Sequence, residues 1–386
     1  MMEKQISKIW YFIAILFLYA LYNIESSRMF IVEDETSLSI LFPLIMSVVS
    51  VASMFLLKAN QDKQFKPFLI LIVVTYLISL IHSLYFPYPA RSCYITLILP
   101  AFTAIFAYRL IDNGINQAFL FSCLCVLFAM LALFFFSNYS NNALLDISSQ
   151  NNAAYTLLYF LPLLLCVKNK YVRIAAIIVT SIALLFSLKR GGTLAFALAL
   201  VAYLFVELHV LSQKTSKLSY LILIVICIWG AYEVYSNFFS GQADMLINRF
   251  SLGNEGGSGR DGIYRAVLNL ISSSDIIGYL LGHGYGGVLN TSIGLSAHND
   301  YLEFMYDYGI LGLCLLIVFV YKFARYTIYL CRCKSFYAGP ATFALIIILV
   351  NTLVSHIFYY EWYMLIWAIF FGLIYALPKV DNPIKR

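Results

Sequence analysis

The side chains that could carry chemistry gather in one polar stretch, residues 260–312, of a chain that is otherwise strongly apolar. The stretch holds two arginines, Arg260 and Arg265, four glycines within residues 282–287, and the segment His298-Asn299-Asp300-Tyr301. A histidine titrates near neutral pH, which suits a general base, and arginine side chains match phosphate oxygens through paired hydrogen bonds. These residue types predict a site for an anionic ligand, with His298 as the candidate base.

A second basic pair, Lys189-Arg190, precedes two glycines and is predicted to form the tip of a hairpin between two membrane spans. A lone arginine at a membrane interface commonly extends its charge into the headgroup layer without binding any ligand. Several arginines on the outer side, close to a glycine-rich segment, instead favour an anionic ligand such as a membrane-bound diphosphate.

Three acids, Asp300, Glu303 and Asp307, recur at spacings that place them on one face of a helix. Two interpretations are open. The acids could begin the helix, with Asp300 as its N-cap and Glu303 as the capping-box partner, or they could bind sugar hydroxyls. Either way, His298 directly precedes a helix that enters the membrane.

The remaining histidines and the glycine cluster carry weaker signals. His82 and His356 lie at the ends of apolar segments and are predicted to be hydrogen-bonded packing residues, while His283 lies between glycines. No Asp-x-Asp or His-Glu-x-x-His sequence is present, so we predict neither a metal site nor any other cofactor. The glycine cluster neither follows a strand nor ends in Gly-Lys-Ser or Gly-Lys-Thr, which argues against a nucleotide-binding loop.

The composition identifies the elements that must position these residues. Hydrophobic residues make up 62% of the 386 residues and charged residues 11%, whereas a soluble domain is about one quarter charged. A transmembrane helix needs ~20 apolar residues. The sequence therefore predicts an all-α polytopic membrane protein, a single integral membrane domain over residues 1–386, with about twelve transmembrane helices at residues 8–24, 38–57, 68–86, 92–110, 117–136, 153–167, 172–188, 191–211, 218–237, 301–321, 340–357 and 362–377.

The basic residues set the predicted orientation. Of the 25 Lys and Arg residues, 18 fall on one set of helix ends and loops, which should be the cytoplasmic side and includes both termini. The opposite side carries the other seven, which are Arg28, Arg91, Lys189, Arg190, Arg249, Arg260 and Arg265. Because the net charge of +6 is spread over short loops, it does not indicate a nucleic-acid partner.

The long segment over residues 238–300 is predicted to be an outer loop that is partly helical. Ile263, Val267, Leu270 and Ile271 recur with the spacing of an amphipathic helix, and Asp261 is a candidate cap for its start. Loops longer than ~15 residues in compact domains are usually functional or disordered, and this apolar stripe indicates order.

Four short motifs, in this order along the chain, resemble those of the bacterial O-antigen polymerase and O-antigen ligase superfamily of polytopic inner-membrane glycosyltransferases. They are Ser187-Leu188-Lys189-Arg190-Gly191-Gly192 after a span, Gly259-Arg260 at the start of a loop helix, the glycine cluster over 282–287, and His298-Asn299-x-Tyr301-Leu302 followed by Gly309-x-x-Gly312. Each motif is weak alone, while their order, spacing and placement on the outer side are fairly specific. The resemblance covers about residues 187–312.

The resemblance implies a GT-C-like helical fold and an undecaprenyl-diphosphate-linked glycan as donor. It also implies a metal-independent, inverting transfer at the periplasmic face of the bacterial inner membrane, so that residues 238–300 would be a periplasmic loop. Carried over by position, Arg190 and Arg260 would hold the lipid diphosphate and His298 would act on the acceptor hydroxyl. Further candidates for substrate binding are Lys189, Arg265, Asn299 and Glu303.

The wording of the motifs favours a polymerase, whose acceptor is a second lipid-linked repeat unit. The alternatives are a ligase, whose acceptor is the lipid A-core, and a transporter of polysaccharide or lipid-linked sugar. A transporter is disfavoured because the sequence has no pair of interrupted spans of the kind that transporters use. The expected partners are the lipid-linked glycans, the bilayer and a protein that regulates chain length.

Overall fold

The structure of the protein, a computed structural model, describes residues 7–29, 38–57, 65–83, 97–141, 147–187, 190–211, 260–358 and 361–381. Every regular element in these ranges is a helix, as the sequence predicts. The helices before the long polar segment are α1 (Lys8–Met29), α2 (Leu38–Leu56), α3 (Lys66–Ser83), α5 (Leu99–Asp112), α6 (Gln117–Asn141), α7 (Ile147–Leu165), α8 (Lys170–Ser187), α9 (Arg190–Phe205) and the π-helix η2 (Val206–Val210). The later helices are α12 (Arg260–Ser273), α13 (Ile276–Leu281), α14 (Asp300–Arg332), α15 (Ala338–Val354) and α16 (Glu361–Asp381).

The described helices fit a polytopic membrane protein. Six of them are long and apolar enough to cross a membrane, at Lys8–Ser26, Gln117–Ser137, Lys170–Ser187, Gly191–Val210, Asp300–Arg332 and Tyr363–Val380. Shorter apolar helices cover Leu41–Leu56, Lys66–His82, Ala153–Leu165 and Ala338–Val354. The predicted span 218–237 lies outside the described residues, so the count of twelve and the GT-C-like arrangement stay predictions.

Helix α16 forms the centre of the bundle. Its side chains from Tyr363 to Leu377 are all buried, as expected for a helix that is apolar on every side. It approaches α5 closely at Gly372, where a Cβ atom would lie 2.5 Å from the carbonyl oxygen of Ala104 and 2.8 Å from Cβ of Ala107. A larger residue at 372 would therefore separate the two helices.

An aromatic cluster ties α3 and α14 to α16. The ring of Phe371 on α16 lies 4.9 Å from Phe68 of α3 and 5.1 and 5.3 Å from Phe319 and Phe323 of α14, measured between ring centroids. Aromatic pairs of this kind contribute about 0.5–1.5 kcal/mol each beyond the burial of their area. The membrane half of α14 is thus held firmly, and the other half of the same helix begins in the His298 motif.

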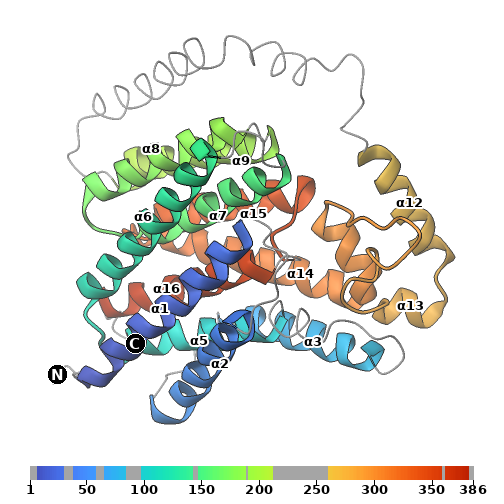
Figure 1. The fold of residues 1–386 in the computed structure, drawn as a ribbon, viewed down its shortest axis with the longest axis horizontal. Helices are drawn as coiled ribbons and strands as arrows, with labels where there is room; N and C mark the ends of the chain where they lie inside the picture. The colour runs from blue at the N-terminus through green and yellow to red at the C-terminus, as the bar shows by residue number, and fades with distance from the viewer. Residues whose placement is uncertain are drawn as a thin grey trace, which may run out of the picture.

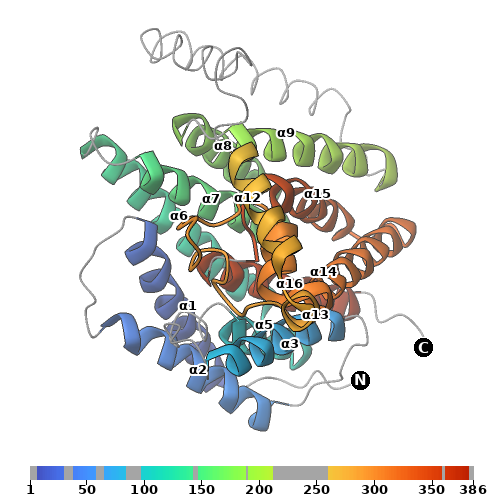
Figure 2. The same ribbon diagram turned by 90° about the vertical axis from the view of Figure 1, so that its right-hand side faces the viewer.

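A lobe made of α12, α13, residues 282–299 and the first turns of α14 caps one end of the bundle (Figures 1 and 2). Its own small core consists of Val267, Val288, Ala297 and Tyr306. Partly buried residues packed around this core include Ile263, Leu270 and Ile271, which confirms the amphipathic stripe predicted for α12. The prediction of Asp261 as the cap was wrong, because α12 begins at Arg260 and Asp261 already lies in its first turn.

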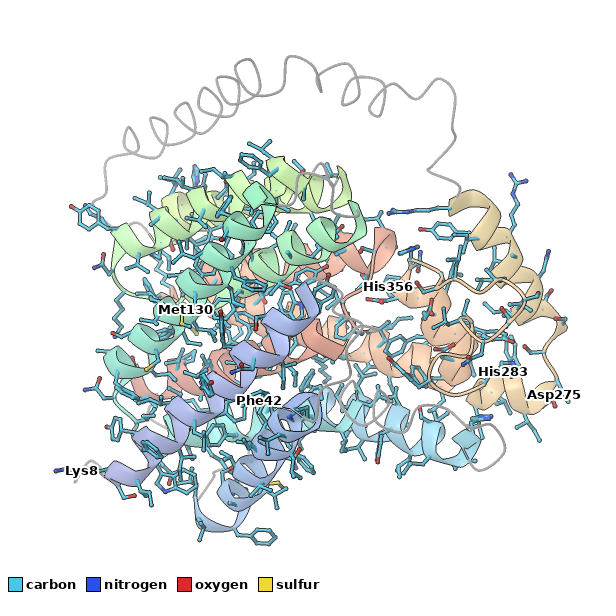
Figure 3. All side chains as sticks on the ribbon, viewed as in Figure 1. Lys8, Phe42, Met130, Asp275, His283 and His356 are labelled. Carbon is cyan, nitrogen blue, oxygen red and sulfur yellow. The ribbon has the colours of Figure 1, made fainter. Side chains whose placement is uncertain are left out.

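The lobe and the first residues of the bundle lie at opposite ends of the molecule. Figure 3 places Lys8 at one end and Asp275 and His283 at the other, and α16 finishes on the same side as the start of α1 (Figure 1). The predicted topology needs this arrangement, with Lys8 and the end of α16 on one side and the lobe on the other.

Helix α14 is interrupted at Gly309, which has a φ of 64° and a ψ of −168°. The break frees the carbonyl oxygens of Tyr306 and Asp307, and these accept hydrogen bonds from the backbone N–H groups of His283 at 3.0 Å and Gly284 at 2.7 Å. A break inside an apolar helix is tolerated only where neighbouring groups satisfy the freed backbone. Here the glycine cluster does so.

Two left-handed glycines make this contact possible. Gly282, with a φ of 75°, ends α13, and a Cβ atom on it would overlap the backbone of Asp307. A Cβ atom on Gly309 would overlap the carbonyl group of Leu280 and lie 2.6 Å from the backbone nitrogen of Leu281. The end of α13 and the break in α14 therefore pack backbone against backbone, which explains glycine at both positions.

Candidate functional site

The C-terminal end of α15 is where the candidate residues converge. A guanidinium nitrogen of Arg260, the first residue of α12, donates to the carbonyl oxygen of Val354 at 2.6 Å. One turn further along α12, the hydroxyl of Tyr264 donates to the carbonyl oxygen of Leu353 at 3.3 Å, and the side-chain amide of Asn299 donates to the same oxygen at 3.1 Å. These carbonyls lie in the last turn of α15, whose carbonyl groups lack partners within the helix. Arg260 and the His298 loop are thus anchored to neighbouring residues.

The first turn of α9 reaches the same place. A Cβ atom on Gly191 would lie 3.2 Å from the side chain of Val354 and 3.5 Å from the hydroxyl of Tyr155, a buried residue of α7. The Tyr155 hydroxyl is within hydrogen-bonding range of the Ser355 side chain. The backbone of Arg190, which precedes Gly191, therefore lies beside the turn that anchors Arg260. The side chain of Arg190 and all of Lys189 lie outside the described residues.

His298 has an unusual backbone that is held from both sides. Its φ is 52°, a value that residues other than glycine seldom adopt. Its backbone N–H donates to Nε2 of His356 at 3.0 Å, and its carbonyl oxygen accepts from the Tyr264 hydroxyl at 3.4 Å. The side chain is partly exposed, and its ring centroid lies 5.1 Å from that of His356. The structure thus presents His298 at the surface of the lobe with its backbone fixed from beneath.

Beneath His298 lies a buried acid–imidazole–hydroxyl chain. Oδ1 of Asp300 lies 3.1 Å from Nδ1 of His356, and Nε2 of His356 lies 3.0 Å from the hydroxyl of Ser296. The other oxygen of Asp300 accepts from the backbone N–H groups of Ile357 at 2.8 Å and Phe358 at 3.2 Å. The prediction that His356 is a buried, hydrogen-bonded residue is confirmed, and its partners join the start of α14 to the turn after α15.

The start of α14 corrects one assignment made from the sequence. The N-cap is Asn299, whose side-chain oxygen accepts from the N–H groups of Tyr301 at 3.0 Å and Leu302 at 3.1 Å. The prediction of Asp300 as the N-cap was wrong, because Asp300 already lies in the first helical turn and faces the turn after α15. Asn299 thus uses its side-chain oxygen for the cap and its amide nitrogen for the α15 carbonyl.

The other two acids of the α14 face also accept from backbone amides. The Glu303 carboxylate accepts from the N–H of Ala297 at 2.6 Å, and not from the N–H of the N-cap, as a capping box would require. The two oxygens of Asp307 accept from Gly286 and Val288, both at 3.0 Å. Both carboxylates are fully buried. The acidic stripe therefore fixes the loop over 282–299 onto α14.

His283 and Arg265 lie apart from this convergence. The His283 ring stacks on Tyr306 at 4.3 Å, and its Nε2 lies 3.0 Å from the hydroxyl of Ser274. Burial, together with the nearby imidazole of His82, lowers the pKa of His283 below its ordinary value. Arg265 is exposed and lies on a different face of α12 from Arg260.

Sequence reasoning missed the turn of residues 353–356, together with Tyr155, Tyr264 and Ser296. Of these residues, only His356 could be recognised in the sequence, as a histidine at the end of an apolar segment. That position is equally typical of a histidine that only packs in the core. Among the described residues, no group of three His, Cys, Asp or Glu side chains is arranged to hold a metal ion. The guanidinium of Arg260 and the backbone of the first turn of α9 both lie beside Val354, the last residue of α15.

Comparison with known protein families agrees with the motifs. A family model described as O-antigen ligase matches residues 175–317, from α8 to the membrane half of α14. None of the curated proteins matches the chain. The family covers O-antigen ligases and polymerases, which are membrane glycosyl-transferring enzymes that act on lipid-linked glycans. The match over residues 175–317 is consistent with the O-antigen polymerase and ligase superfamily that the motifs resemble.

Proposed function

We propose that this protein is a glycosyltransferase that polymerises undecaprenyl-diphosphate-linked oligosaccharide repeat units at the periplasmic face of the bacterial inner membrane. The observation that carries the proposal is the anchoring of Arg260 and His298 to one turn. Arg260 donates to Val354, and His298 donates through its backbone to His356, two residues further along the chain. A cation and a candidate base thus share one support, at the end of the bundle where a membrane-bound diphosphate would present its charge.

The chemistry requires no more than these groups supply. The acceptor hydroxyl attacks the anomeric carbon of the donor glycan, the bond from that carbon to the diphosphate breaks, and the lipid diphosphate leaves with the electron pair. His298 takes the hydroxyl proton. Arg260, with Arg190 at the start of α9, stabilises the negative charge that develops on the leaving diphosphate, which fixed guanidinium groups can do without a metal ion.

The decisive assay is transfer in vitro from a purified lipid-diphosphate glycan, with the protein in detergent or vesicles. Because a general base typically contributes ~10²–10⁴-fold, His298→Ala should keep donor binding and lose turnover by about that factor. If His298→Ala turns over normally, His298 is not the base. If both Arg260→Ala and Arg190→Ala also keep their activity, the proposed diphosphate site is wrong as a whole.

The ligase is the second candidate, because the matching family is described by that activity. The two differ only in the acceptor, so the same assay separates them. A polymerase elongates a lipid-linked repeat unit into a ladder of products, whereas a ligase transfers a single glycan to lipid A-core. Transfer to lipid A-core with no ladder would replace the polymerase proposal.

The transporter alternative is less well supported. The described residues contain one broken apolar helix, and the carbonyl groups freed at its break bind the N–H groups of His283 and Gly284. They are therefore already occupied by the protein itself. Elongation by purified protein in detergent, where no gradient exists, would favour the enzyme, and uptake without elongation would favour transport.

A further inference from the structure

His356 sits at the centre of a hydrogen-bond network that no part of the proposed reaction uses. Its side chain is completely buried, as is that of Asp300. Nδ1 faces the Asp300 carboxylate at 3.1 Å, and Nε2 faces both the Ser296 hydroxyl and the backbone N–H of His298 at 3.0 Å. A polar group buried this deeply is expensive unless it is fully bonded. We therefore ask what this network contributes to the function of the site.

The donors around His356 determine its tautomer. A backbone N–H can only donate, so Nε2 must accept from His298, and the imidazole proton must lie on Nδ1. That proton is donated to Asp300, whose other oxygen already accepts from Ile357 and Phe358. Asp300 thus acts only as an acceptor, and it keeps the Nε2 lone pair of His356 available to the His298 N–H and the Ser296 hydroxyl, both at 3.0 Å.

This lone pair helps hold His298 in its left-handed conformation. With a φ of 52°, the backbone of His298 is in a region that L-residues leave readily when unsupported. The bond to His356 fixes its N–H, and its carbonyl oxygen, 3.4 Å from the Tyr264 hydroxyl, shares the single proton of that hydroxyl with the carbonyl oxygen of Leu353 at 3.3 Å. The direction in which the His298 side chain leaves the backbone depends on both.

We propose that His356 and Asp300 form a positioning pair, in which Asp300 sets the tautomer of His356 and His356 orients His298 toward the acceptor hydroxyl. This proposal rests on the proposed function, because it assigns His298 as the base. Neither residue of the pair touches substrate. Their loss should therefore reduce turnover and leave the affinity for the lipid-diphosphate donor nearly unchanged.

The test compares three variants at matched amounts of folded protein. His356→Ala should lower kcat by about 10–100-fold, with the KM for the donor within about threefold, because misplacing a base costs rate and not binding. His356→Gln should recover much of the loss, since its amide can accept from His298 and donate to Asp300. Asp300→Asn should resemble His356→Ala, because an amide facing Nδ1 favours the tautomer that places a second donor opposite the His298 N–H.

Asp307→Asn is the matched control. Asp307 is an equally buried acid on α14, but it accepts from Gly286 and Val288 and lies outside the network. It should lose stability while the kcat of the folded fraction stays within about threefold of the parent. This separates general damage to α14 from a specific effect on His298.

Two results would overturn the positioning role. One is a kcat within threefold of the parent for His356→Ala and Asp300→Asn, while His298→Ala is inactive. The other is His356→Gln no more active than His356→Ala at equal stability, which would reduce His356 to packing. Should His356→Ala not fold, the Gln and Asn variants carry the comparison. Normal turnover of His298→Ala would instead refute His298 as the base. That result tests the proposed function and is distinct from the two results that test the positioning pair.

A second inference comes from the exposed surface of α13. Of its six residues, Ile276 is 79% exposed, Ile277 64% and Leu280 48%. Large apolar side chains gathered in this way mark an interaction surface. Between Arg265 and Lys322 the sequence has no Lys or Arg, so attraction to anionic headgroups or to an acidic partner is not the basis of this surface.

The surface continues the exposed apolar side of α3. The end of α3 exposes Leu80 and Ile81, and the loop that follows α13 is joined to it by a hydrogen bond from the N–H of Tyr285 to the Ser79 hydroxyl at 3.2 Å. We infer that α13 lies in the outer boundary of the bilayer, with its apolar side chains among the lipid chains, as interfacial helices do. The occupant of this surface is therefore phospholipid.

Photocrosslinking tests this directly and does not depend on turnover. A benzophenone amino acid at position 277 should crosslink to labelled phospholipid in vesicles about as efficiently as one at position 80. The same probe at position 269, an exposed polar position of α12, should give little lipid adduct. Crosslinks from position 277 to a second copy of the protein, or none at all while position 80 labels lipid, would overturn the inference.

Discussion

The backbone contact between α13 and the break in α14 gives a quantitative prediction for Gly309→Ala. Gly309 has a φ of 64° and a ψ of −168°, a region that essentially only glycine occupies, and another residue held there costs roughly 1–3 kcal/mol. The new methyl group would also overlap the carbonyl group of Leu280, and forcing atoms into packed structure adds typically about 1–3 kcal/mol. Because both partners are backbone, no side-chain rotation can relieve the overlap. The variant should lose about 2–6 kcal/mol of unfolding free energy.

Two other glycines separate the conformational cost from the steric cost. Gly294 has nearly the same φ, 63°, but a Cβ atom there would have no neighbour within 4 Å. Gly294→Ala should therefore cost only the conformational part, about 1–2 kcal/mol. Gly262 lies within α12 and also has open space around it. Gly262→Ala should be neutral or stabilise the protein by about 0.5–1 kcal/mol.

The assay is equilibrium unfolding of the purified protein in one detergent, with the free energies of the three variants compared with the parent. The order of stability should be Gly262→Ala, then Gly294→Ala, then Gly309→Ala, with at least about 1 kcal/mol between the last two. Equal losses for Gly294→Ala and Gly309→Ala would refute the close approach of α13 to α14. The account of why both positions are glycine would then fail.

Four further predictions follow from the site and its surroundings. Arg260→Ala should lower kcat by about 10²–10³-fold, and Arg260→Lys should restore only part of the activity, because an ammonium cannot form the paired bonds of a guanidinium. The control Arg265→Ala, at an exposed arginine, should change transfer far less. Equal effects at the two arginines would refute the assignment of Arg260 to the diphosphate site. Since the pKa of His283 in the folded protein is lowered, protonation favours the unfolded state, so thermal stability should fall as the pH drops below about 6.5. His283→Gln should lose less stability over that range, and an unchanged pH profile would show that another group is responsible. Transfer activity should survive a chelator, and a loss that added Mg²⁺ restores would contradict the metal-free mechanism. Reporter fusions at Gly256 and Lys385 should give opposite signals for localisation, and matching signals would refute the proposed topology.

Local patterns in the sequence were enough to predict the helices and the face that α12 buries. Apolar segments of membrane length become helices because a backbone in lipid has no other way to satisfy its hydrogen bonds. The spacing of Ile263, Val267, Leu270 and Ile271 predicted the buried face of α12, because helical periodicity alone decides which side chains share a face. The glycine cluster was recognisable as a tightly turned or closely approached backbone, because few residues other than glycine tolerate such conformations.

The start of α14 shows where local rules become ambiguous. Both Asn299 and Asp300 are good N-cap residues by type, and the capping-box spacing of Asp300 and Glu303 suggested the acid. The structure uses Asn299, because Asp300 has a better partner in the turn after α15, far away in the sequence. The capping choice thus depended on a contact that no local pattern contains.

The sequence by itself determined that the protein is a helical membrane protein with an arginine- and histidine-bearing motif on a polar segment. Only the tertiary structure decided which groups support that motif. His356 lies 56 residues from Asp300 and Val354 lies 94 residues from Arg260 along the chain. The acceptors for Arg260, Tyr264 and Asn299 in the last turn of α15 are backbone carbonyls, which every residue possesses, so no residue type marks them in advance. Their role arises only when α15 ends, its last carbonyl groups lose their helical partners, and the lobe folds over them.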